Sequence, residues 1–274
     1  MKVSEKRFEF FDEQRSGLST LLAVTHKEYL PLKNIPPKDS FPLYNGRAAF
    51  TSFETSLRIR FAYLEKFLEN DFFRTSLGSP YPISELFLAK GFSGVANSAY
   101  DYFKISGSVS DYIKIPPYGS FYFNVYGGKT FGTLPYVLLD IAPGNELYYY
   151  DQYAFNTMNK YEFIHDQYLG MDFEYNIGNG IFRFLSPTRK LKFRQLFTAK
   201  TLWGSLSDAN KALNFKQGTG FQTLDGRTFL ELGTGIDNIL RVFRLDFVWR
   251  VLPRPLPLNK SEKFGVFGSF RVSF

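Results

Sequence analysis

Acidic and basic side chains recur at alternate positions in the C-terminal half of the sequence. Alternation places such residues on one face of a β-strand. Opposite charges on neighbouring strands can form a ladder of ion pairs that fixes the register of a sheet, or can line a charged pathway for a substrate. We favour the ladder. The residues that could form it, with Glu231 nearby, are Asp166, Asp172, Glu174, Lys192, Arg194, Arg244, Asp246 and Arg250.

Residue types that carry catalysis or bind metals do not form a recognisable motif. The sequence has no cysteine, which excludes disulfides, zinc–thiolate sites and thiol nucleophiles. Its two histidines, His26 and His165, have no second ligand at metal spacing, and we expect His165 at a membrane interface. Ser205, Ser207 and Asp208 could contribute to a hydrolase site, but nothing in the sequence places a histidine beside them. We therefore predict a protein that is not an enzyme and uses no metal or cofactor.

Composition narrows the class of protein further. Aromatic residues make up 19% of the 274 residues, and aromatic residues favour strands and the interfaces of membrane barrels. No apolar run approaches the ~20 residues of a transmembrane helix. The formal net charge is +7, but the basic residues are scattered rather than clustered, so nucleic acid is not expected as a partner.

The segments that position these residues alternate like β-strands. Several are 12 residues or longer, whereas strands of soluble proteins mostly have about 5–6 residues and membrane strands need ~9–11. Length and one-sided charge favour an all-β, transmembrane antiparallel β-barrel, with a soluble sandwich as the alternative. We count about eleven strands, although single-chain bacterial barrels usually have an even number. The clearest are residues 48–62, 99–113, 163–176, 188–203 and 239–251, and the less certain ones are 5–11, 17–30 and 81–93.

The terminal segment, residues 263–274, alternates strictly and ends on an aromatic residue. Such a strand is how outer-membrane barrels close their sheet, and Gly265 and Gly268 would make this one easy to fray. The connections also alternate in length, with short ones at 116–119 and 235–238, a somewhat longer one at 176–188, and long ones at 131–162, 204–226 and 252–262. This places the C-terminus on the side of the short, periplasmic turns. The apolar residues expected at the seam are Phe264, Phe270, Val272 and Phe274.

The long connection 131–162 is rich in aromatic residues, unlike a disordered segment. We expect it to be ordered, either as a cap on the surface or folded into the barrel mouth or lumen. The residues that we single out in it are Asp140, Glu146, Tyr149, Asp151 and Tyr153.

Several segments resemble the C-terminal barrel of the BamA-type superfamily of surface antigens and outer-membrane assembly factors. The resemblance is greatest to an uncharacterised branch abundant in Bacteroidota, whose members usually carry an N-terminal carboxypeptidase-regulatory-like domain. It covers residues from about 98 to 274, and a segment at 74–82 extends it. The matching segments are residues 127–136 (Gly-Gly-Lys-Thr-Phe-Gly-Thr-Leu-Pro-Tyr), 143–145 (Pro-Gly-Asn), 153–158 (Tyr-Ala-Phe-Asn-Thr-Met), 161–163 (Tyr-Glu-Phe), 203–207 (Trp-Gly-Ser-Leu-Ser) and 235–250, together with Phe274.

This resemblance implies a sixteen-stranded barrel in the bacterial outer membrane, with residues 1–274 as the C-terminal barrel domain of a longer precursor. The absence of a signal peptide at Met1 agrees with a fragment. Connection 131–162 then corresponds to the superfamily's inward-folded sixth loop. That loop normally carries a Val-Arg-Gly-Phe-like motif whose arginine meets acidic lumen residues, yet residues 131–162 contain no arginine. A replacement contact would reverse the polarity, with Asp140, Glu146 or Asp151 facing Arg194 or Arg244.

The function that the resemblance implies is assistance in the assembly, insertion or translocation of outer-membrane or surface proteins. Its partners would be outer-membrane lipid and lipopolysaccharide, together with other outer-membrane or periplasmic proteins such as assembly machinery and lipoproteins. Two alternatives stay open. One is a passive or selective pore with a charged lumen, and the other is a structural scaffold for surface lipoproteins.

Overall fold

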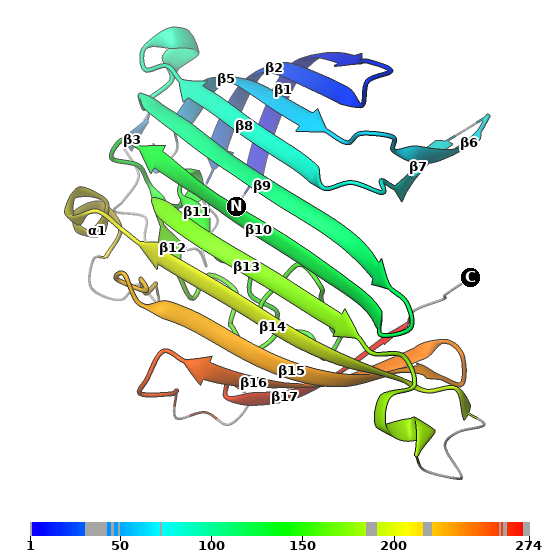
Figure 1. The fold of residues 1–274 in the computed structure, drawn as a ribbon. Helices are drawn as coiled ribbons and strands as arrows, with labels where there is room; N and C mark the ends of the chain where they lie inside the picture. The colour runs from blue at the N-terminus through cyan, green and yellow to red at the C-terminus, as the bar shows by residue number, and fades with distance from the viewer. Residues whose placement is uncertain are drawn as a thin grey trace.

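The computed structural model describes residues 2–30, 43–44, 47–48, 50–71, 73–184, 191–215, 221–257, 259 and 262–270. One sheet of eleven strands dominates it, which confirms the expected strand number and the all-β class (Figure 1). Every neighbouring pair in this sheet is antiparallel. In sheet order the strands are β1 (Lys2–Glu13), β2 (Leu18–Leu30), β5 (Phe50–Phe61), β8 (Ile83–Gly91), β9 (Tyr102–Ile115), β10 (Gly119–Phe131), β13 (Gln167–Asn176), β14 (Arg194–Ser205), β15 (Thr228–Ile239), β16 (Phe243–Leu252) and β17 (Phe264–Phe270).

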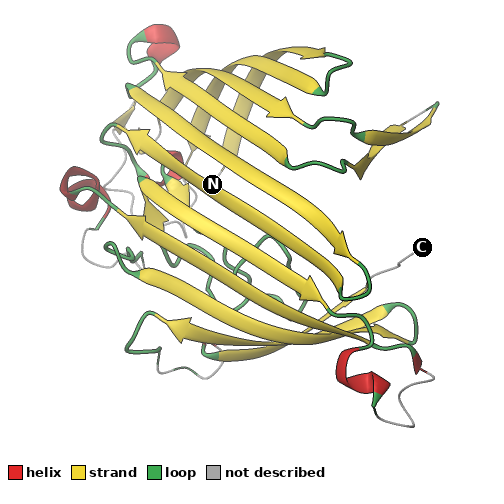
Figure 2. Cartoon of the chain, in the orientation of Figure 1, coloured by secondary structure: helices red, strands yellow, loops and turns green. Residues whose placement is uncertain are grey.

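The smaller elements lie in the connections between these strands (Figure 2). Three are two-stranded ribbons: β3 (Leu43–Tyr44) with β4 (Arg47–Ala48), β6 (Lys66–Asn70) with β7 (Phe73–Gly78), and β11 (Asp140–Ile141) with β12 (Ile164–His165). The helical elements are α1 (Asp208–Asn214) and the 3₁₀ turns η2 (Val95–Asn97), η3 (Tyr136–Leu138) and η4 (Gly180–Arg183). Within the described ranges, no helix combines the length and the apolar character that crossing a membrane requires.

The sheet curves so that its first and last strands bend toward the same side (Figure 1). Its two faces differ as the alternating pattern predicts. In β16, Arg244 is 4% exposed and Asp246 is 1% exposed, whereas Trp249 on the opposite face is 44% exposed. A charge on the lipid face of a barrel costs about 2–4 kcal/mol at the membrane midplane, so an outward apolar face with inward charges is the arrangement that a membrane barrel requires.

The expected alternation of short and long connections holds only in part. One end of the sheet carries the tight turns 14–17, 116–118 and 240–242, but also the longer connections 62–82 and 177–193, and the other end carries the long connections 132–166 and 206–227. The turn expected at 235–238 was placed too early, because β15 continues to Ile239. The reversal instead uses Leu240 and Arg241, which adopt positive φ angles of 51° and 72°.

Helix α1 fixes the start of the long connection 132–166. Asn210 and Asn214 are buried and lie one helical turn apart, so both amides face the same neighbour. The Asn210 Oδ1 atom accepts a hydrogen bond from the Leu134 amide at 2.8 Å, and the Asn214 Oδ1 atom accepts one from the Tyr136 amide at 2.7 Å. Two side-chain amides therefore replace the backbone partners that this irregular segment lacks.

Candidate functional site: an inner loop on the charged face of the sheet

Residues 132–166, which we call the inner loop, connect β10 to β13 and lie within the curve of the sheet (Figure 1). Apolar residues of the loop pack against the inward face of β14 and β15. Phe155, Met158 and Phe163 are almost completely buried in one cluster with Leu202 and Phe229. The inner loop is therefore ordered and folded inward, and of the two arrangements expected from the sequence it adopts the one inside the barrel.

Glu231 of β15 binds the backbone of the loop. Its Oε1 atom accepts a hydrogen bond from the Asn156 amide at 3.1 Å, and its Oε2 atom accepts bonds from the amide and the hydroxyl of Thr157 at 3.1 and 3.0 Å. A buried carboxylate is stable only where several donors replace its water shell. Glu231 therefore fixes the middle of the loop to the sheet.

Lys200 of β14 binds the same part of the loop, but it donates hydrogen bonds to carbonyl oxygens of the loop, whereas Glu231 accepts them from amides. Its ammonium donates to the carbonyl oxygen of Asp151 at 2.8 Å and to that of Ala154 at 2.5 Å. Lys200 and Glu231 are register partners on adjacent strands. One cross-strand pair of opposite charge thus holds both the carbonyls and the amides of residues 151–157.

Arg250 of β16 forms the ion pair between the sheet and the loop. Its Nη2 atom lies 2.8 Å from the Oε1 atom of Glu162, and both side chains are buried. The other carboxylate oxygen of Glu162 accepts the Asn159 amide at 2.9 Å. The Arg250 guanidinium also stacks over the Phe229 ring, 4.7 Å from its centroid, which is a favourable cation–π arrangement.

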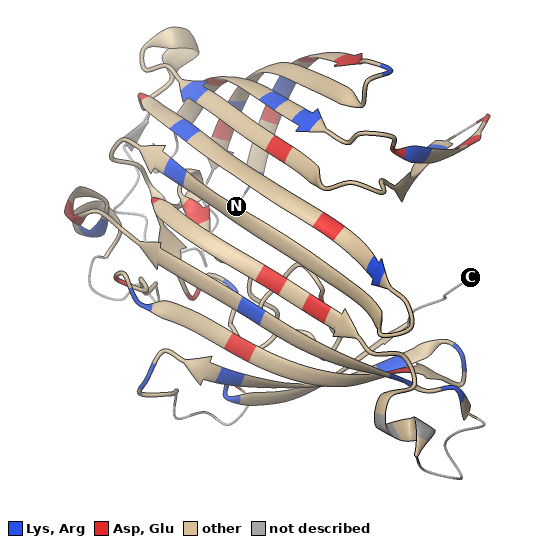
Figure 3. Cartoon of the chain, in the orientation of Figure 1, with Lys and Arg blue, Asp and Glu red and all other residues tan. Residues whose placement is uncertain are grey.

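Arg244 of β16 lies nearer the short-turn end of the sheet. Two of its nitrogens contact the Asp246 carboxylate at 2.7 and 2.8 Å, and a third contacts Glu174 of β13 at 2.7 Å. The guanidinium also lies over the ring of Tyr150 from the inner loop, 4.4 Å from its centroid. Charged residues on β13 to β16 thus follow one another across the sheet (Figure 3), and the loop covers them.

Four residues of the expected charge network lie outside the cluster of Glu174, Arg244 and Asp246. Asp166 accepts hydrogen bonds from the Ser207 amide and the Asn210 side chain, and Asp172 accepts one from Asn124. Lys192 is exposed and precedes β14, and Arg194 begins β14 opposite Asp237. The ladder across all eight residues was therefore wrong in extent. Glu174, Arg244 and Asp246 form a direct cluster, and Arg250 binds the loop.

The acidic loop residues singled out in the sequence do not contact Arg194 or Arg244 through any hydrogen bond or ion pair of the described residues. Asp140 accepts a hydrogen bond from Thr130 at 2.9 Å, and Glu146 accepts one from the Lys160 amide at 3.2 Å. The Asp151 carboxylate accepts the Tyr153 amide at 2.8 Å. The reversed polarity does occur, with an acid on the loop and arginine on the sheet, but the acid is Glu162 and the arginine is Arg250.

The sequence did contain a signal for the missed contacts. Asn156 and Thr157 belong to the segment 153–158 that resembles the BamA-type superfamily, and Glu162 lies in the resembling segment 161–163. The choice among the acidic residues rested on charge alone. Backbone amides and carbonyls, which take most of the loop contacts, carry no sequence signal.

The C-terminal strand presents Phe264 and Phe270 on the outward face, where both are exposed. Val272 and Phe274, the other two residues expected at the seam, lie outside the described residues. Phe267 is the one large apolar residue of the opposite face, and it is buried with Tyr150 and Val248. The aromatic residue that broke the alternation in the sequence is thus the contact between β17 and the inner loop.

His165 lies at the junction of the inner loop and β13, and it is buried rather than at an interface as we expected. Burial lowers the pKa of its imidazole from 6.5 to about 4. The Cβ of an alanine at position 204 would lie 2.8 Å from its Nδ1 atom, so Gly204 makes the space for the ring. Among the described residues, no group of three or more histidine, cysteine or acidic side chains is arranged to hold a metal ion.

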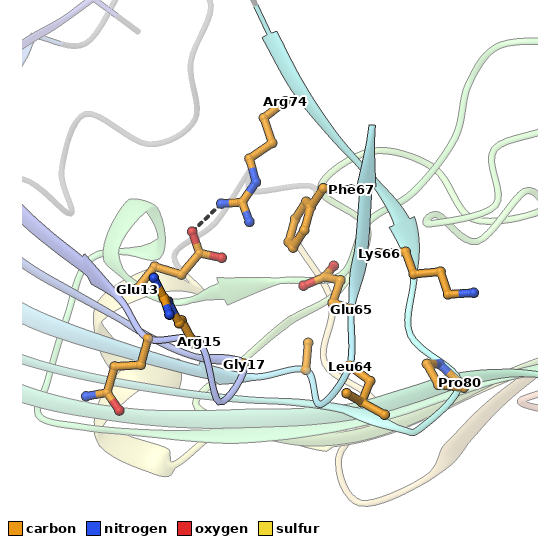
Figure 4. A pocket seen from close by; sticks show the side chains of 11 residues that line it. Glu13, Arg15, Gly17, Leu64, Glu65, Lys66, Phe67, Arg74 and Pro80 are labelled. Atoms are coloured by element: carbon orange, nitrogen blue, oxygen red, sulfur yellow. Dashed lines mark hydrogen bonds and ion pairs between the residues drawn. The ribbon is translucent and has the colours of Figure 1, made fainter. Parts of the chain in front are cut away.

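A hollow lies at the short-turn end, between the β1–β2 turn and the β6–β7 ribbon (Figure 4). It has a volume of about 630 Å³. Arg74 pairs with Glu13 across it and lies over the Phe67 ring, 3.5 Å from its centroid. Beside it, Arg60 binds Glu65 through two nitrogens at 2.6 and 2.7 Å. These contacts tie the ribbon to the sheet.

The curved antiparallel sheet, its apolar outward face and its inward loop define an all-β fold of the membrane-barrel class. Comparison with solved structures agrees. The crystal structure of BamA from Haemophilus ducreyi lacking POTRA domains 1-3 is similar with a TM-score of 0.57 and 12% sequence identity. The similarity covers 98% of this chain and 54% of that one, so the chain spans about half of the BamA chain.

The family is defined by sequence. Residues 15–209 match the C-terminal domain of the family of unknown function DUF5686, and the chain belongs to this family. A comparison with curated proteins finds no match.

Proposed function

We propose that the protein is a non-enzymatic barrel of the bacterial outer membrane that assists the assembly, insertion or translocation of other outer-membrane or surface proteins. The observation that carries the proposal is the inner loop, which Lys200, Glu231 and Arg250 hold against the inward face of a BamA-type sheet. Outer-membrane lipid and lipopolysaccharide would surround the apolar face. Periplasmic assembly proteins and lipoproteins are the protein partners that this function requires.

A passive pore is less well supported by the same geometry. The inner loop lies on the charged face, and Arg244 and Arg250 are bound to carboxylates of the protein itself. A selectivity filter instead offers its charges to passing ions. The scaffold for surface lipoproteins is compatible with the fold, but no contact among the described residues favours it.

The experiment is depletion of the full-length protein in its native host, followed by quantification of the outer-membrane proteome. The proposal predicts that a subset of barrel or surface proteins falls while their transcripts stay constant. Re-expression of the wild-type protein is the control, and a Glu231→Gln variant, which weakens one of the three anchors of the inner loop, tests the part that the loop plays. The proposal fails if depletion leaves the outer-membrane proteome unchanged and the purified protein conducts ions in planar bilayers.

A further inference from the structure

The outer edge of β17 is occupied by backbone of the inner loop. The Gly268 amide donates to the Tyr148 carbonyl at 2.9 Å, and the Tyr150 amide donates to the Gly268 carbonyl at 3.1 Å. Tyr149 and Gly268 thereby form a parallel bridge. The amide and the carbonyl of one residue point to the same side of a strand, so these bonds lie on the side of Gly268 that faces away from β16.

The side chain of Tyr150 anchors this segment on the inward face. Tyr150 is 5% exposed and packs against Val248 and Phe267. The guanidinium of Arg244 also lies over the Tyr150 ring. The strand-like contact at the edge is therefore coupled to the charge cluster of β13 and β16.

Two asparagines connect the segment to the anchors of the loop. Asn145 donates to the Tyr149 carbonyl at 2.7 Å and to Asn156 at 2.8 Å. The Asn156 side chain binds the Asp151 amide at 2.9 Å, and its backbone amide binds Glu231. Release of the loop from Glu231 would therefore loosen residues 148–150 as well.

The contact at the edge is short. Gly268 alone supplies both groups. Phe264, Val266 and Phe270 direct their backbone groups to the same edge, because alternate residues of a strand do so, and they have no backbone partner there among the described residues. A cavity of about 420 Å³ separates β17 from the loop beside them. Tyr148 is 84% exposed. Two hydrogen bonds correspond to roughly a 10- to 100-fold preference for the bound state, which a longer strand can overcome.

We propose that residues Tyr148, Tyr149 and Tyr150 act as an internal placeholder strand on the outer edge of β17. A partner that adds to this edge is an extended segment with apolar residues at alternate positions, because Phe264 and Phe270 already present an outward apolar face there. The partner strand binds only after the placeholder leaves. The identity of the partner as a client protein rests on the proposed function, whereas the placeholder contact itself does not.

Residues 1–274 contain no cysteine, so a pair of cysteines introduced there can lock the contact. We would use the full-length protein in outer-membrane vesicles with Tyr149→Cys and Gly268→Cys, since bridged residues lie within disulfide distance. The matched control is Leu245→Cys with Gly268→Cys, which joins β16 to β17 at a register pair and leaves the loop free. A Cβ at position 268 meets no heavy atom closer than 4.0 Å, so the shared substitution is tolerated.

The probe is a photoreactive synthetic peptide with the sequence of residues 263–270, which has the alternating pattern of β17 itself. We expect labelling of β17 to fall about 10-fold when the Tyr149→Cys, Gly268→Cys pair is oxidised, and to return with reductant. The oxidised control pair should label like the wild type, and Tyr150→Ala should label more strongly than the wild type.

Failure of the 149–268 disulfide to form, together with fast exchange of the Gly268 amide, would overturn the placeholder. Equal labelling of the oxidised and reduced locked protein would overturn its role in blocking the edge. Reductant-dependent labelling in a protein whose depletion leaves the outer-membrane proteome unchanged would support the placeholder while rejecting the assembly function.

Discussion

Strands β1 and β16 carry similar sequence patterns but have opposite environments. In β16, and in residues 7–10 of β1, charged residues alternate with apolar ones. In β16 the charged residues Arg244 and Arg250 are buried under the inner loop, whereas in β1 the Arg7 side chain remains 41% exposed and pairs with Glu9 at the surface. The pattern therefore determines which face of the sheet is polar. The covering segment determines whether those charges contribute to stability.

The largest loss of stability is expected on replacing Arg244, which is the most buried of the arginines compared between β1 and β16. Replacement by Met removes the guanidinium that contacts two buried carboxylates, Glu174 and Asp246, and puts an apolar side chain beside them. We expect a loss of about 3–5 kcal/mol in the free energy of unfolding. Urea titration of the protein folded in lipid vesicles, followed by tryptophan fluorescence, measures it. A loss below about 1 kcal/mol would show that water, rather than Arg244, satisfies the two carboxylates.

Acid should loosen the loop region through His165. Its pKa is 6.5 in the unfolded chain and about 4 in the folded protein, so between these values only the unfolded chain takes up a proton. Stability is therefore complete above pH 6.5, falls as the pH decreases toward 4, and loses about 3 kcal/mol in total from this group.

Urea titrations between pH 8 and pH 4 test this prediction. Carboxylates also titrate near the lower limit, so the informative quantity is the difference between the wild type and His165→Asn. The free energy of unfolding of the wild type should fall relative to that of His165→Asn as the pH decreases below 6.5. A constant difference across the range would indicate that the His165 ring is hydrated in the folded protein.

A smaller and more local effect is expected at Glu231. Substitution by Gln keeps the shape but removes the charge that accepts three hydrogen bonds from Asn156 and Thr157. We expect a loss of about 2 kcal/mol and faster proteolysis within residues 151–157. The control is Glu9→Gln in β1, which should leave the cleavage pattern of the loop unchanged. Slow cleavage in both variants would mean that Lys200 and Arg250 suffice to hold the loop.

The smallest loss of stability is expected in β1, at Arg7. Arg7→Met in β1 removes only an exposed ion pair with Glu9. Exposed pairs contribute about 0–1 kcal/mol, so the unfolding midpoint should barely move. The same titration that measures Arg244→Met measures this variant. A large loss here would show that β1 is covered in the folded protein, and the contrast between the two strands would disappear.

Much of the fold was predictable because strand identity depends on local alternation. The strands at 239–251 and 99–113 and the strand number followed from a two-residue period. The turn after β15 was misplaced because Asn238 and Gly235 resemble turn residues although they belong to the strand. Element boundaries depend on pairing with the neighbouring strand, which local sequence does not contain.

The site was predictable only in part. Arg244, Asp246 and Glu174 were identified because alternation puts them on one inward face. Glu162 was missed because several acidic residues of the loop were equivalent by sequence, and only the path of the loop brings this one to Arg250.

The sequence alone determined that the chain forms long amphipathic strands, which face of each strand is charged, and that its long aromatic connection is ordered. Those properties arise from periodicity and composition, which are local. The tertiary structure decided which charges are buried, that Lys200 and Glu231 bind loop backbone, and that Tyr148 and Tyr150 pair with Gly268. These contacts join residues that are tens of positions apart, and they depend on backbone groups that every residue shares, so only the folded path of the inner loop selects them.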